Sequence, residues 1–192
     1  MPDEPFNPTS IGTHHMRTEH TNPYTQELPT PYYAVPPAHV KTIPEMMRAN
    51  GYFCTNNFKT DYQFEVPLTA WDENGREAHW RNREPGQSFF AVFYYIFTHE
   101  SCMWPGEMTK FLHKIQGGEK PLMTDPNRVI VPPYIPDTPK SRLALAKLYD
   151  NVANADEYVG RILQQLDEDG LADNTIVMLW SDHGEGLPRA KR

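Results

Sequence analysis

Polar side chains that can bind a metal or an oxyanion follow two apolar runs of the sequence. Asp182 and His183 come directly after the apolar residues 176–180, and His99 follows a second apolar run, residues 88–97. A carboxylate supplies oxygen ligands to a hard cation, and an imidazole binds metals or transfers protons near neutral pH. We therefore expect the two positions to carry chemistry.

Cations follow the first of these positions and a third, separate stretch. Arg189, Lys191 and Arg192 lie seven to ten residues after Asp182, and Lys59 follows a β-prone stretch of its own. Cations and N–H donors bind tetrahedral oxyanions. The same residue types also occur where there is no site, because Asp and Gly are common where a strand turns and a lone lysine is often only solvated. The residues alone leave an ordinary turn and an ion-binding site as alternatives.

The elements that must position these side chains indicate an α/β fold. Residues 88–97 and 176–180 are apolar without alternation, which predicts strands buried on both faces. Leucines, valines and isoleucines recur every three or four residues over 139–169, which predicts a long helix that begins after Thr138 and ends at Gly170. Helix, short turn and strand in this order predict a mostly parallel central sheet flanked by helices. The carboxyl ends of its strands would bring His99 to the edge that carries the polar residues after 180.

A second helix is predicted over residues 40–50. Thr42 suits its N-cap and Gly51 its C-terminal stop. Residues 62–87 show no clear period and are interpreted as a surface excursion from the sheet.

Length and charge limit the possible functions. The 192 residues suffice for one domain, and the net charge of −7 with no long basic run argues against a nucleic-acid partner. No apolar stretch reaches the length of a membrane span, and the start has no signal-peptide pattern. Cys54 and Cys102 fix neither a compartment nor a disulfide.

Three segments together resemble the sulfatase family of the alkaline-phosphatase-like superfamily. They are residues 50–62 (NGYFCTNNFKTDY), residues 89–101 and residues 169–185, in this order and spacing. The sequence is most similar to bacterial arylsulfatases and heparan N-sulfatase-like enzymes. The resemblance implies an alkaline-phosphatase-like α/β sandwich and the hydrolysis of a sulfate ester or N-sulfate. The substrate would be a small molecule or a sulfated glycan.

The resemblance also implies roles for five residues. Asp182 and His183 match positions that hold a calcium or magnesium ion. Lys59 and His99 match the lysine and histidine that contact the sulfate group. Lys191 matches the second lysine, which holds the sulfate and the leaving-group oxygen. Lys59, His99 and Lys191 are thus the expected catalytic and substrate-binding residues.

The sequence departs from the family pattern at the nucleophile. Sulfatases use a formylglycine made from a Cys/Ser-x-Pro-x-Arg motif, and neither Cys54 nor Cys102 lies in such a motif. The first metal-binding aspartate pair is also missing, and Asp61 stands where many members have a histidine. We therefore expect residues 1–192 to be part of an amino-terminal catalytic domain without its nucleophile region and its carboxy-terminal part. Such a chain would be inactive alone.

Two other functions stay open. One is a metal-dependent phosphohydrolase or mutase of the same superfamily, and the other is a non-catalytic remnant that binds anions or glycans. The acidic net charge disfavours the second, because glycan-binding modules usually have a broad basic face. The sequence leaves the substrate, the choice of metal and the oligomeric state undecided. It also leaves the compartment open, although the family includes periplasmic and secreted enzymes.

Overall fold

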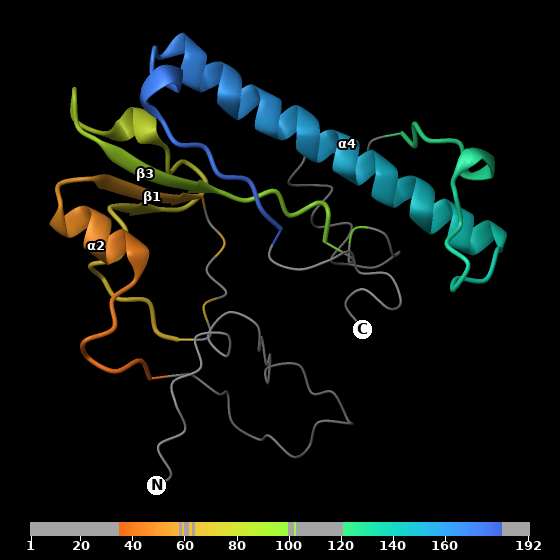
Figure 1. Ribbon diagram of the computed structural model, residues 1–192, viewed down its shortest axis with the longest axis horizontal. Coiled ribbons are helices and arrows are strands. Elements are labelled where there is room, and N and C mark those ends of the chain that lie inside the picture. Colours follow the sequence, from red (N-terminus) through yellow and green to blue (C-terminus); the bar gives the residue numbers. More distant parts are fainter. Residues whose placement is uncertain are drawn as a thin grey trace, which may run out of the picture. The chain divides into compact units, whose positions relative to one another are not determined.

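The computed structural model describes residues 35–57, 59, 62, 64–99, 102 and 121–181. The chain divides into two compact units, Met1–Tyr94 and Tyr95–Arg192. The elements of the described residues, in chain order, are α2 (Ile43–Ala49), β1 (Phe53–Asn57), β2 (Glu73–Asn74), the 3-10 helix η1 (Trp80–Asn82), β3 (Phe89–Phe93), η3 (Pro126–Arg128), α4 (Pro139–Glu168) and η4 (Ala172–Asn174). Figure 1 labels α2, β1, β3 and α4.

The first unit contains a parallel sheet with the strand order β2-β1-β3 among its described residues. Thr55 of β1 is in register with Glu73 of β2 on one side and with Ala91 of β3 on the other. The central strand β1 is covered on both faces, since Cys54 and Asn56 are 0% exposed and Thr55 is 1% exposed. The predicted parallel arrangement of the strands is thereby confirmed for this part of the chain.

Helix α2 precedes β1 and begins with a complete capping box. The Glu45 N–H donates to the Thr42 hydroxyl, and the Thr42 N–H donates to the Glu45 carboxylate at 2.9 Å. The helix is followed by Gly51, whose φ of 85° is favourable only for glycine. The predicted helix over residues 40–50 is confirmed with its N-cap.

The polar excursion over residues 62–87 is more than a surface loop. It supplies β2, and its Trp80 is 1% exposed because the indole packs on Phe89 and Phe93 of β3. Interpreting the excursion as surface was wrong at this tryptophan. The tryptophan belongs to the core of the first unit, where aromatic rings bury the most apolar area per residue.

Helix α4 of the second unit has the boundaries that the sequence predicts. Thr138 caps its N-terminus by accepting from the Ser141 N–H, and Gly170 follows its C-terminus with a φ of 67°. The Gly170 N–H donates to Asp167 O and the Leu171 N–H to Leu166 O, which is a Schellman motif. No helix in the described ranges combines the length and the apolar character needed to cross a membrane.

The first half of α4 packs against the loop that precedes it and hydrogen-bonds to it. Val129, Leu145 and Ala146 form a small core. Asp150, 7% exposed, accepts hydrogen bonds from the main-chain N–H groups of Met123 and Thr124 at 2.7 and 3.0 Å.

Two predicted strands differ from the structure. The strand expected over residues 88–97 is shorter, Phe89–Phe93, and its residues are only partly buried. The strand expected over residues 176–180 does not form among the described residues, and its side chains are 54–88% exposed. An apolar run becomes a buried strand only when neighbouring strands accept and donate its main-chain hydrogen bonds, and no described strand pairs with this one.

Candidate active site

Lys59 lies just beyond the carboxyl end of β1, at the edge of the parallel sheet where α/β folds bind their ligands. Its main-chain carbonyl accepts a hydrogen bond from the side-chain amide of Asn56 at 2.9 Å. Its ammonium nitrogen lies 6.0 Å from the ring centroid of Tyr94, the residue that follows β3. The ends of two adjacent strands therefore position this lysine.

Aromatic side chains accompany Lys59. The Trp71 indole N–H donates to the Tyr62 hydroxyl at 3.1 Å, and Trp71 stacks on Phe90 of β3. Burial and the neighbouring Tyr94 hydroxyl raise the pKa of Tyr62 to about 12, so this phenol stays protonated at neutral pH. The sequence analysis missed Asn56, Tyr62 and Tyr94, whose only signal was their place beside strand ends.

His99 lies in the second unit, in a turn beyond β3. The His99 N–H donates to Ile96 O at 3.1 Å, and the Cys102 N–H donates to His99 O at 2.9 Å. Its side chain is exposed, as a group that meets a substrate from solution must be. The expectation that His99 shares one edge of the sheet with Asp182 and His183 stays a prediction, because those two residues lie outside the described part of the chain.

The other predicted site residues, Asp182, His183 and Lys191, lie outside the described residues. Within the described ranges, no group of three His, Cys, Asp or Glu side chains could hold a metal ion. The calcium or magnesium site assigned to Asp182 and His183 therefore stays a prediction, as does the role of Lys191.

Both cysteines are buried. The Cys54 thiol donates to Pro44 O at 3.6 Å, and burial, followed by the nearby Asp72 carboxylate, raises its pKa to about 11. A thiol that stays protonated is a poor nucleophile. Cys54 therefore has a structural role, which agrees with its position outside any formylglycine motif.

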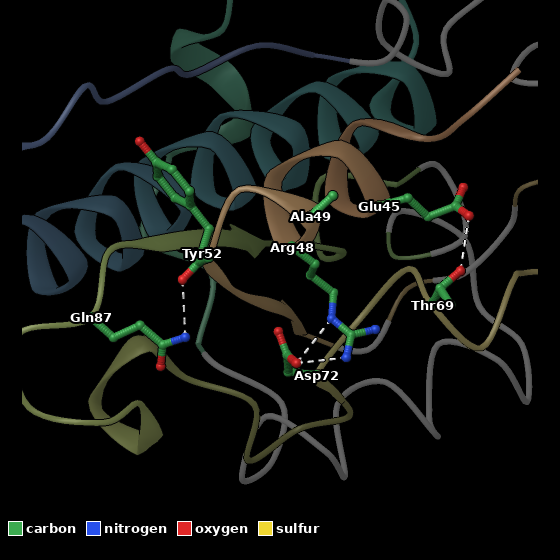
Figure 2. A pocket seen from close by; sticks show the side chains of 8 residues that line it. Glu45, Arg48, Ala49, Tyr52, Thr69, Asp72 and Gln87 are labelled. Carbon is green, nitrogen blue, oxygen red and sulfur yellow. Dashed lines mark hydrogen bonds and ion pairs between the residues drawn. The ribbon is translucent and has the colours of Figure 1, made fainter.

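A cavity of about 400 Å³ lies between α2 and the loops that precede β2 and β3 (Figure 2). Its walls contain an ion pair in which the Arg48 guanidinium contacts Asp72 at 2.8 Å. The Thr69 hydroxyl donates to Glu45, and the Gln87 side-chain amide donates to Gly51 O. None of the predicted site residues lines this cavity. The sequence analysis did not predict it, because Arg48 and Asp72 are far apart in the chain.

Comparisons with known proteins identify relatives of this chain. The profile of the family described as Sulfatase matches residues 76–191, more than half of the chain. An ulvan-active sulfatase of Formosa agariphila is 42% identical over 96% of this chain and 35% of its own length. The human N-sulphoglucosamine sulphohydrolase is 38% identical over 37% of this chain and 14% of its own length. No solved structure gives a significant match.

The chain thus spans about a third of the length of the ulvan-active sulfatase that it matches. The resemblance predicted from the three segments is confirmed, and so is the α/β class, because the family fold agrees with the parallel sheet and its helices. The extent of the chain relative to a complete catalytic domain stays a prediction. On the strength of the profile match, the chain belongs to the sulfatase family.

Proposed function

We propose that this chain provides part of the catalytic domain of a hydrolase that removes sulfate from a sulfated carbohydrate. The observation that carries the proposal is the place of Lys59, fixed at the carboxyl edge of a parallel sheet in a chain of the sulfatase family. The relative that matches almost the whole chain is named an ulvan-active sulfatase, so we propose ulvan as the first substrate to test.

In this proposal Lys59 and Lys191 bind the sulfate oxygens. Cleavage of the ester S–O bond places negative charge on the transferred group and on the departing oxygen, and fixed cations stabilise that charge best in a partly dehydrated site. His99 donates a proton to the departing oxygen. Asp182 and His183 would hold a calcium or magnesium ion, whose positive charge would add to that of the lysines.

The nucleophile is not supplied by the described residues. Cys54 is buried with a raised pKa, and the sequence contains no Cys/Ser-x-Pro-x-Arg motif that could yield a formylglycine. We therefore propose that these 192 residues do not turn over a sulfate ester by themselves. Catalytic sulfate release by the isolated chain, abolished by Lys59→Ala, would contradict this.

The decisive experiment begins with the gene. Reading it on both sides of the codons for Met1 and Arg192 shows whether an in-frame Cys/Ser-x-Pro-x-Arg motif lies upstream. The longest encoded protein is then assayed for sulfate release from ulvan, from N-sulphoglucosamine and from p-nitrophenyl sulfate, with p-nitrophenyl phosphate in parallel. Sulfate release that is lost in Lys59→Ala supports the proposal. Phosphate release alone would favour a phosphohydrolase. Glycan binding without turnover would favour a non-catalytic remnant that binds glycans.

A further inference from the structure

Asn56 is a polar residue in the most buried strand of the first unit. It lies in β1, the central strand of the sheet, and is 0% exposed. Central strands favour β-branched and aromatic side chains, and asparagine is depleted in them. An amide at this position therefore needs a reason other than packing.

The hydrogen bonds of Asn56 give a reason for an amide at this buried position. Its Nδ2 donates to Lys59 O at 2.9 Å and to Asn74 Oδ1 at 2.8 Å. A main-chain carbonyl can only accept, so the nitrogen and not the oxygen of the amide must face Lys59. The opposite atom, Oδ1, is buried without a partner among the described residues. The amide is thus oriented entirely by its two acceptors, although one of its own polar atoms stays unsatisfied.

The segment that this amide holds carries the candidate sulfate-binding lysine. Asn56 fixes the main chain of Lys59 from the end of β1, and Asn74 of β2 fixes Asn56 in turn. The ammonium group of Lys59 lies over Tyr94 at the end of β3. All three strands of the described sheet therefore contribute to the position of one cation.

We propose that Asn56 is a positioning residue for Lys59, oriented by Asn74. The proposal rests on the proposed function, in which Lys59 binds the sulfate group. Asn56 does not touch the substrate. It holds the main chain at Lys59, so that the ammonium group is already near its sulfate-binding position before the sulfate binds.

The first test needs no substrate. Asn56→Leu keeps the branched shape and the number of heavy atoms of the side chain and removes the donor. The matched control is Asn57→Leu, because the neighbouring Asn57 also donates from Nδ2 to a main-chain carbonyl, that of Arg76, at 2.9 Å. We expect amide hydrogen exchange in the peptide that contains Lys59 to rise about tenfold in Asn56→Leu and to change by less than about twofold in Asn57→Leu. Unchanged exchange in a folded Asn56→Leu protein overturns the proposal.

The second test uses inorganic sulfate and the NMR signal of the Lys59 side chain, assigned with Lys59→Ala. We expect Asn56→Leu to weaken sulfate binding about tenfold and Asn57→Leu to leave it within about twofold of wild type. Asn74→Leu removes the acceptor that orients Asn56 and should behave like Asn56→Leu. Asn74→Asp keeps an acceptor at this exposed position and should bind like wild type.

The two tests separate the two proposals. If exchange rises in Asn56→Leu but the wild-type Lys59 signal does not respond to sulfate, Asn56 still positions Lys59 and the function proposed for that lysine is wrong. If wild type and Asn56→Leu bind sulfate equally, the proposed function stands and the positioning role is wrong. Failure of Asn74→Asp to restore binding would overturn the part assigned to Asn74.

Discussion

Asp72 joins helix α2 to the central strand through both of its carboxylate oxygens. Oδ1 accepts from Arg48 Nε at 2.9 Å and lies 2.8 Å from Arg48 Nη2, while Oδ2 accepts from the Cys54 N–H at 2.7 Å. The Asp72 N–H returns a hydrogen bond to Cys54 O at 2.8 Å. Asp72, which immediately precedes β2, therefore extends the hydrogen bonding between β2 and β1 and also binds helix α2 through Arg48.

Asp72→Ala should destabilise the first unit by about 2–3 kcal/mol, because it leaves the buried Cys54 N–H without its acceptor and the Arg48 guanidinium without its carboxylate. The control is Glu157→Ala, which breaks an exposed ion pair with Arg161 of 3.1 Å and should change stability by less than about 0.5 kcal/mol. Urea unfolding followed by tryptophan fluorescence measures both. Equal effects of the two substitutions would show that Asp72 acts only as a surface charge.

The Cys54 thiol should be almost unreactive in the folded protein. Burial raises its pKa from 9.0 to about 11, which lowers the thiolate fraction at pH 8 by about 100-fold, and reagents must also reach a side chain that is 0% exposed. In a Cys102→Ser background, labelling by Ellman's reagent should be at least about 100-fold slower without urea than with it. Rapid labelling of the folded protein would mean that β1 opens readily or that Cys54 is accessible.

The features that the sequence predicted well depend on neighbouring residues. Thr42 and Thr138 cap the helices, and Gly170 ends α4, because capping hydrogen bonds join residues only a few positions apart. The family resemblance worked for a similar reason, since it rests on short contiguous segments. For the site, the resemblance accordingly yields candidate residues, which stay predictions, and no geometry.

The features that the sequence missed depend on partners that are distant in the chain. The apolar residues 176–180 were predicted as a buried strand, but a strand also needs ladder partners. Trp80 was assigned to the surface, although Phe89 and Phe93 bury it. We made no prediction for Asn56, because its role depends on hydrogen bonds to Lys59 O and Asn74 that only the folded structure shows.

Asp150 illustrates the same limit and gives a third prediction. Asp156 of α4 is exposed, whereas Asp150 of the same helix accepts the N–H groups of Met123 and Thr124. Asp150→Ala should therefore cost about 2–4 kcal/mol and release the loop over residues 121–128, whereas Asp156→Ala should be nearly neutral. Limited proteolysis and urea unfolding test this. Equal protease resistance of the Asp150→Ala protein and wild type would contradict it.

Glu45 should make stability depend on pH in the acid range. The Thr42 N–H, aided by the hydroxyl groups of Thr69 and Thr42, holds the pKa of this carboxyl below its usual value of 4.5, against the opposing effect of burial. The folded state thus favours the ionised form. Its contribution is complete above pH 4.5 and is lost as the pH falls through the lowered pKa.

Wild type should consequently exceed Glu45→Gln in unfolding free energy at pH 7 by up to about 1 kcal/mol, the scale of a capping interaction, and the difference should shrink as the pH falls below 4.5. Glu65→Gln, at an exposed position outside the capping box, is the control and should show no such change. Urea unfolding of the three proteins at pH 7, 4.5 and 3 measures the effect. A difference between wild type and Glu45→Gln that stays constant with pH would mean that the amide replaces the carboxylate in the capping box, so that the ionised charge adds nothing to the helix.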